Sequence, residues 1–168
     1  MQLSFERRVR VPRTKTRDMK EHIKSEMEPL LFLIGRWNTE GEIIANEGNA
    51  ANKFTGTDSY EWILDGHFIL HKVDVTMNNE KVEAIEIIGG FDATTKRYKM
   101  RSFDNQGAFT EMEAYIDEKG IFHILGDKMR SKLSMRDSNT LIAHWENSKD
   151  NKNWLPWMDL KLSNKNNH

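Results

Sequence analysis

The chain has 168 residues, of which 38% are hydrophobic, with three prolines, no cysteine and a net charge of −1. This length fits one domain with a self-sufficient core, and the lack of cysteine excludes disulfides, thiolate metal sites and a cysteine nucleophile. No stretch resembles a transmembrane helix or the apolar part of a secretory signal, so we expect a cytoplasmic protein with no membrane partner.

Basic residues gather at the N-terminus, where residues 1–20 hold seven lysines or arginines and two acids. We interpret residues 1–17 as a mobile basic arm and residues 18–168 as a single domain. A basic arm can bind phosphates, but the rest of the chain has no basic stripe interleaved with aromatics. The domain itself is therefore not expected to bind nucleic acid.

Residues 18–28 are predicted to form a helix. Asp18 can cap it with Glu21 as its partner, and an apolar residue recurs every four positions at Met19, Ile23 and Met27. Pro29 is expected to end this helix. The apolar run 30–34 follows, and it suits either a plug over one mouth of a barrel or a segment packed on the outside.

Short strands separated by turn residues fill the remainder of the chain. No helical pattern long enough for a parallel crossover intervenes, so the connections are sequential hairpins. The fold class is therefore all-β: an antiparallel, up-and-down closed β-barrel of about ten strands with a short N-terminal helix. The interior of such a barrel is either hollow, with room for a small ligand, or a solid core. The predicted strands are 36–45, 54–64, 67–77, 81–91, 97–104, 108–117, 120–126, 129–136, 139–147 and 156–163.

The turn at Asp65-Gly66 fixes the register of the first long hairpin. An Asp-Gly pair favours a type I′ turn, which places Tyr60 opposite His71 and Trp62 opposite Ile69. The alternate residues of both strands that share this face are mostly apolar, whereas the other face is polar. The inward faces are predicted to be Phe54, Gly56, Asp58, Tyr60 and Trp62, and Ile69, His71, Val73, Val75 and Met77.

The next turn, Asn78-Asn79, decides where Glu86 points. A two-residue type I′ turn brings Glu86 opposite His71 and turns Ala84 and Ile88 inward. A three-residue loop would instead select the neighbouring face, which is equally apolar. Glu86 therefore faces the interior only if the tighter turn forms.

Later hairpins complete the predicted interior. Gly107 suits the left-handed position of a three-residue loop, which pairs Met100 with Met112 and Ser102 with Thr110. The remaining inward positions are Tyr98, Ala114, Ile116, Leu133, Met135, Leu141, Ala143, Trp145, Met158, Leu160 and Leu162.

We interpret the protein as a binding module for a small hydrophobic or amphipathic molecule held inside the barrel. A first alternative is a barrel enzyme of the isomerase or lyase type, with Tyr60, His71 and Glu86 as an acid–base set. A second is a scaffold or interaction protein, and a homodimer is left open. The predicted ligand-binding residues are Trp37, Tyr60, Trp62, His71, Met100, Ser102, Met112 and Trp145.

No metal site and no cofactor are predicted. His71 and His123 could both face inward, but neither belongs to a closely spaced ligand pair. Glycine-rich phosphate loops, nucleophile elbows and HExxH motifs are absent from the sequence.

Several motifs recur in order along the chain: Gly35-Arg36-Trp37, the hairpin Trp62–Leu70, Ile88–Asp92 with Tyr98, Phe103–Gly107 and Trp157-Met158. They resemble those of a bacterial lipocalin-like family of unknown function in the calycin superfamily. The resemblance covers residues 28–163 and implies a roughly ten-stranded barrel that at most binds a ligand. Related haem-binding barrels use a histidine near the C-terminal strands. His144 is the candidate here, and alternation points it outward, so haem is not expected.

Overall fold

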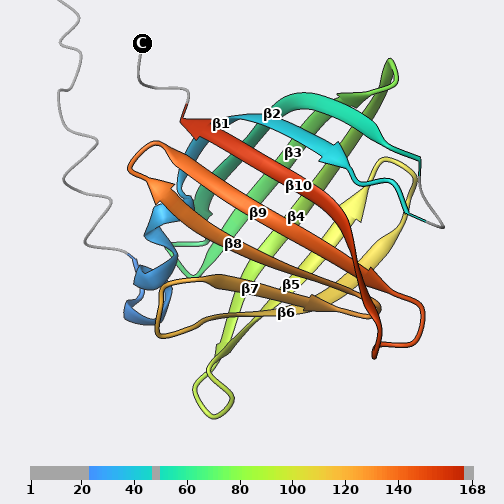
Figure 1. Cartoon of the computed structure of the whole chain (residues 1–168). Helices are drawn as coiled ribbons and strands as arrows, with labels where there is room; N and C mark the ends of the chain where they lie inside the picture. The colour runs from blue at the N-terminus through green and yellow to red at the C-terminus, as the bar shows by residue number, and fades with distance from the viewer. Residues whose placement is uncertain (1–22, 47–49, 165–168) are drawn as a thin grey trace, which may run out of the picture.

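The computed structural model describes residues 23–46 and 50–164, which form ten antiparallel strands and one 3₁₀-helix (Figure 1). Every strand end lies within two residues of its predicted position. The strands are β1 (Gly35–Ile43), β2 (Asn52–Ile63), β3 (Phe68–Met77), β4 (Glu80–Asp92), β5 (Arg97–Asp104), β6 (Phe109–Ile116), β7 (Phe122–Gly126), β8 (Met129–Asp137), β9 (Thr140–Ser148) and β10 (Trp154–Asn164).

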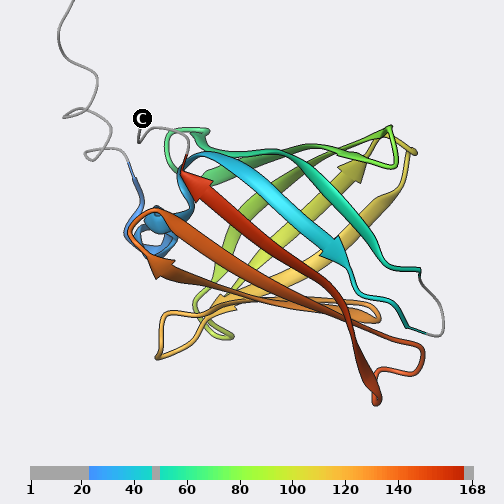
Figure 2. The ribbon, with the colours of Figure 1, turned by 45° about the horizontal axis from the view of Figure 1, so that its top comes forward.

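The ten strands close into a barrel, as predicted. Each strand pairs with its neighbours in sequence, and β1 also pairs with β10, so that Trp37 lies opposite Asn164. Figure 2 shows β1 and β10 side by side along one wall. Closure gives every described strand a partner on both sides and leaves no free sheet edge.

Both early turns adopt the predicted left-handed backbone. Asn78 and Asn79 have φ angles of 51° and 63°, and Asp65 and Gly66 have 57° and 75°. Leu64 is also left-handed, at φ 51°, so the ladder between β2 and β3 ends one pair earlier, at Ile63 and Phe68. The predicted register is unaffected, because Tyr60 lies opposite His71 and His71 opposite Glu86.

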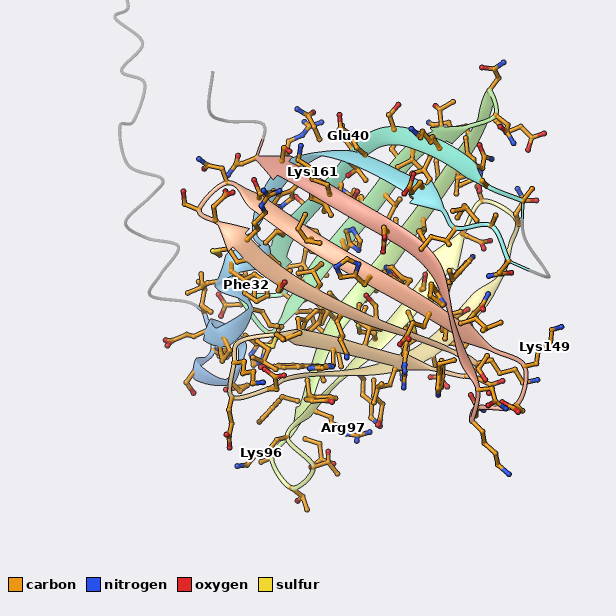
Figure 3. All side chains as sticks on the ribbon, in the orientation of Figure 1. Phe32, Glu40, Lys96, Arg97, Lys149 and Lys161 are labelled. Carbon is orange, nitrogen blue, oxygen red and sulfur yellow. The ribbon has the colours of Figure 1, made fainter. Side chains whose placement is uncertain are left out.

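The interior of the barrel is filled at one end, and burial is mixed in the other half. The filled end is covered by the 3₁₀-helix η2 (Ser25–Leu33), where Ile69, Ile88 and Leu141 are at most 1% exposed. Nearer the opposite end burial is mixed: Val73, Ala84 and Ser102 are only partly buried, whereas Phe54 and Val75 are 4% and 5% exposed. Figure 3 places Phe32 of η2 at the filled end and Lys149 at the opposite end, and we call the half of the interior on the Lys149 side the cup.

The short helix differs from its prediction. Residues 23 and 24 are not helical, and η2 runs through Pro29 and includes most of the apolar run that was expected to follow the helix. Its buried residues, Met27, Leu30 and Leu33, recur every three positions, which is the period of a 3₁₀-helix rather than an α-helix. These side chains join the barrel core, as the plug interpretation requires.

Two further expectations concern single residues. Met135 was predicted to face the core but is 49% exposed, because it is the last inward position before the turn after β8, where the register shifts. His123 lies on the outer face, where it stacks on Tyr115 and hydrogen-bonds Asp117, so it does not face the interior.

The basic arm at 1–17 and the helix cap at Asp18 and Glu21 lie outside the described residues. Among the residues that the structure does describe, no helix is both long and apolar enough to cross a membrane.

Candidate functional site

Four neighbouring strands bring polar side chains into the middle of the barrel. Alternation along β2 turns Asp58 and Tyr60 inward, and the two tight turns bring His71 of β3 and Glu86 of β4 beside them. Thr39 of β1 completes the group and is 1% exposed. We call Thr39, Asp58, Tyr60, His71 and Glu86 the His71 cluster.

Two carboxylates hold the imidazole of His71 between them. Its Nε2 lies 2.6 Å from Oδ1 of Asp58, and its Nδ1 lies 2.7 Å from Oε2 of Glu86. A carboxylate only accepts, so both ring nitrogens act as donors and the ring carries both protons. The other carboxylate oxygen of Asp58, Oδ2, accepts a short hydrogen bond from the hydroxyl of Thr39. Asp58 is therefore engaged through both of its oxygens.

The charge state of His71 follows from this geometry. Burial by itself lowers the pKa of the ring, but hydrogen bonds and charge interactions with Asp58 and Glu86 outweigh it and raise the pKa to about 9. His71 is therefore an imidazolium at neutral pH.

Tyr60 lies flat against this cation. The two ring centroids are 3.9 Å apart and the planes are inclined by 6°. Burial, followed by the charges of Asp58 and Glu86, raises the pKa of the Tyr60 phenol well above its usual value. The phenol stays protonated, so Tyr60 can serve as a stacking surface and a hydrogen-bond donor but not as a base.

The His71 cluster lies where the filled end meets the cup. The side chain of Asp58 is 5% exposed and that of His71 is 9% exposed, whereas that of Glu86 is 15% exposed. Ser102 of β5 lies directly opposite Glu86, and Ala84 is the next inward residue along β4; both are partly buried. Glu86 is thus the carboxylate of the cluster that faces the cup.

The predicted ligand-binding residues divide between the two halves. Trp37 is 3% exposed, and its Nε1 donates to the Leu33 carbonyl at 2.8 Å, so it anchors η2 to the barrel. Met100 and Met112, at 1% and 5% exposed, are packed core. Ser102 and Trp145 are partly buried in the cup, and the partly buried Trp62 lies near the η2 end. The structure does not gather these residues around one hollow.

Three residues of the interior were missed as site candidates: Asp58, Thr39 and Ser131. The sequence contained a sign that Asp58 belongs to the site, because Asp58 is a carboxylate on an inward face that is otherwise mostly apolar. Ser131 of β8 is 2% exposed and, among the described residues, its hydroxyl is the one buried side-chain oxygen or nitrogen without a hydrogen-bond partner. Its inward direction follows from alternation with Leu133.

His123 and His144 lie away from the His71 cluster, each paired with an aspartate of its own. His144 is on the outer face, as alternation predicted, with a side chain 62% exposed and 2.7 Å from Asp159. Within residues 23–46 and 50–164, no three His, Asp or Glu side chains are arranged to hold a metal ion.

A separate hollow of about 480 Å³ lies over the strands β1, β2, β9 and β10. Its lining includes charged side chains such as Glu40 and Lys161, which pair across strands at 3.6 Å and are labelled in Figure 3. Exposed pairs of this kind contribute little free energy. The hollow contains no member of the His71 cluster, and we assign it no function.

The family model described as "Protein of unknown function (DUF1579)" matches residues 23–163. This match spans most of the chain, so the chain belongs to that family. No curated protein sequence matches the chain.

Two solved structures share the fold. The crystal structure of Rv2717c from M. tuberculosis is 7% identical with a TM-score of 0.67, covering 85% of this chain and 99% of that one. The S-type phycobiliprotein lyase CPES from Guillardia theta is 9% identical with a TM-score of 0.57, covering 92% of this chain and 100% of that one. At these identities the likeness is one of fold alone.

Proposed function

We propose that the protein binds a small hydrophobic or amphipathic molecule in the cup of the barrel, with Glu86 as its polar contact. The observation that carries this proposal is the position of the His71 cluster. Three ionised side chains are costly to keep inside a protein, and beside them lie the partly buried inward positions Val73, Ala84 and Ser102. A few convergent polar groups in an apolar hollow are typical of a small-molecule site.

The comparison with known folds supports this proposal only by analogy. A similar barrel serves a phycobiliprotein lyase. The lipocalin-like relationship belongs to the same proposal, and it is supported by the buried Trp37 of the Gly-x-Trp motif, which holds the closing helix. Cytoplasmic localisation, a bacterial origin and the absence of a cofactor stay predictions, and a homodimer stays an open alternative.

The geometry favours binding over the alternative of an acid–base enzyme. A general base needs a free lone pair near neutral pH, and both nitrogens of His71 donate to carboxylates. A pKa of about 9 keeps this ring protonated, and the raised pKa of Tyr60 keeps the phenol protonated. Of the proposed acid–base set, only Glu86 can accept a proton from a bound molecule.

A matched pair of substitutions on β4 tests the proposal. Ala84 faces the cup and Glu83 beside it faces solvent. The neutral dye Nile red should bind the wild type and Glu83→Trp equally, whereas Ala84→Trp should weaken binding at least tenfold because the indole fills the cup. Circular dichroism checks that all three proteins are folded.

A second pair of substitutions, on β5, keeps the proposal testable if one of the β4 variants fails to fold. Ser102 faces the cup from β5, and its neighbour Arg101 faces outward with a side chain 60% exposed. Ser102→Phe should weaken dye binding and Arg101→Phe should not. Equal binding by the inward and outward variants in both pairs would overturn the proposal, because the dye would then lie elsewhere.

A further inference from the structure

The interior of the barrel carries an unbalanced charge. Among the buried or partly buried inward side chains that the structure describes, the charged ones are Asp58, His71 and Glu86. Two carboxylates and one imidazolium sum to one negative charge. The low-dielectric surroundings strengthen the field of this charge over what it would be in water. A ligand group that enters the cup therefore meets this negative charge.

Glu86 is the group through which this charge is reached. Asp58 is closed off, because His71 and Thr39 occupy its two oxygens. The hydrogen bond from His71 uses Oε2 of Glu86 and leaves Oε1 outside that bond, and Glu86 is the more exposed of the two carboxylates. A carboxylate oxygen accepts hydrogen bonds and donates none. The carboxylate of Glu86 can therefore accept a hydrogen bond from a donor group of the ligand.

A second observation on the other side of the interior also points to a ligand. Ser131 lies on β8, four strands from Glu86 in the ring of ten, and its buried hydroxyl has no partner among the described residues. A buried, unpaired hydroxyl costs free energy unless something binds it. Its cross-strand partner is Trp145, whose partly buried ring is a surface that attracts cations.

We propose that the ligand of the cup is an organic amine or a similar cation with an apolar body, and that the site discriminates against anionic amphiphiles such as fatty acids. The inference rests on the proposed function and names the chemical class of the ligand. The cation donates to Glu86, and the apolar body packs in the cup near Trp145 and Ser131. An anionic head group would face Glu86 with no donor to pair with it.

Three molecules with the same ten-carbon chain and different head groups test this inference: decylamine, decanol and decanoate. Each is used below its micellar concentration at pH 7 to displace Nile red from the wild-type protein. Decylamine should bind at least tenfold more tightly than decanoate, with decanol between them. Equal binding by decylamine and decanoate, or tighter binding by decanoate, would overturn this inference. It would not contradict the proposal that the cup binds a small molecule.

Glu86→Gln locates the effect, because it keeps the size of the side chain and removes its charge. The preference for decylamine over decanoate, measured as the ratio of the two affinities in the same variant, should fall about tenfold, and circular dichroism checks that the variant is folded. Glu111→Gln is the control, since Glu111 is an outer-face carboxylate with a side chain 64% exposed, and it should keep the wild-type preference. An unchanged preference in Glu86→Gln would assign the selectivity to another part of the surface.

Failure of the proposed function has a different signature. In that case Ala84→Trp would leave dye binding unchanged, and none of the three decyl compounds would compete differently between Ala84→Trp and Glu83→Trp. Failure of the charge inference alone leaves the Ala84→Trp effect intact and removes only the order of the head groups.

Discussion

At the scale of single residues, the main feature is a histidine held by two carboxylates inside a protein. A buried ion of this kind is stable only while its partners remain, because removing one partner leaves an uncompensated charge. His71, Asp58 and Glu86 therefore depend on one another for stability as well as for their ionised state. The same dependence makes them sensitive to substitution.

Asp58→Asn should lower the free energy of unfolding by roughly 3–5 kcal/mol, the usual cost of breaking a buried ion pair from one side. Urea denaturation followed by tryptophan fluorescence measures the loss. Asp159→Asn is the matched control, because its pair with His144 is largely exposed. Such a surface pair contributes about 0–1 kcal/mol. Equal losses in the two variants would mean that the Asp58 contact contributes no more than a surface pair.

Ser131→Ala should stabilise the ligand-free protein by about 1 kcal/mol, since it removes a buried hydroxyl that has no partner among the described residues. Ser134→Ala on the same strand is the control and should change stability by less than about 0.5 kcal/mol, because its partly buried side chain faces outward. Thermal and urea unfolding both report the difference. A destabilised Ser131→Ala protein would indicate that the hydroxyl has a bound partner.

At the scale of elements, η2 closes the barrel through apolar packing and one indole hydrogen bond. Met27, Leu30 and Leu33 enter the core, and Trp37 of β1 binds the Leu33 carbonyl. Tyr98 of β5 adds a hydrogen bond from its hydroxyl to the Glu26 carbonyl, at 2.6 Å. The helix is thus attached to two separate strands.

Trp37→Ala should cost roughly 3–5 kcal/mol of unfolding free energy, as for other buried aromatic residues. The lost packing, together with the lost hydrogen bond to Leu33, should loosen η2. Arg36→Ala is the control, because the adjacent side chain is exposed. Amide hydrogen exchange in residues 25–33 should speed up in Trp37→Ala alone; unchanged exchange there would show that Trp37 does not hold the helix.

The elements also show why the register was predictable and the full cluster was not. Left-handed residues in the Asp65-Gly66 and Asn78-Asn79 turns fix which residues lie directly opposite one another, and this was enough to join Tyr60, His71 and Glu86. Asp58 lies directly opposite Val73, and it reaches His71 diagonally. Such diagonal contacts depend on side-chain conformation and strand twist, which the sequence pattern does not contain.

The prediction of the helix failed for a similar local reason. An interval of four residues between Met19, Ile23 and Met27 indicated an α-helix, and Pro29 was taken as its end. The structure instead buries every third residue from Met27 onward. This spacing of three residues lets the buried side chains cover the end of the barrel core. The need to cover that core comes from the closed barrel and not from the local sequence.

At the scale of the whole molecule, the stability of the barrel should depend on pH through His71. Its pKa is raised from about 6.5 in the unfolded chain to about 9 in the folded protein. The folded state therefore binds this proton more tightly. The resulting stabilisation is fully present below pH 6.5 and is lost as the pH rises through 9.

The free energy of unfolding should thus fall by up to roughly 3 kcal/mol between pH 6 and pH 10, taking about 1.4 kcal/mol for each unit of pKa. Urea denaturation at a series of pH values measures this slope. Glu86→Gln should flatten it, because one of the two hydrogen-bonded carboxylates is then uncharged, and NMR titration should show a lower pKa for His71. A wild-type stability that is constant or rises over this range would contradict the assignment.

The closure of the barrel between β1 and β10 also has a consequence for how the protein is made. The ribosome synthesises β1 early, and roughly 110 residues separate its end at Ile43 from the start of β10 at Trp154. At about 5–20 residues per second, the nascent chain waits on the order of 6–20 seconds for its last strand. During that time β1 can pair only with β2, and its other edge is open to a neighbouring nascent chain. The same pairing that removes every sheet edge from the described barrel thus delays its closure until β10 has been synthesised.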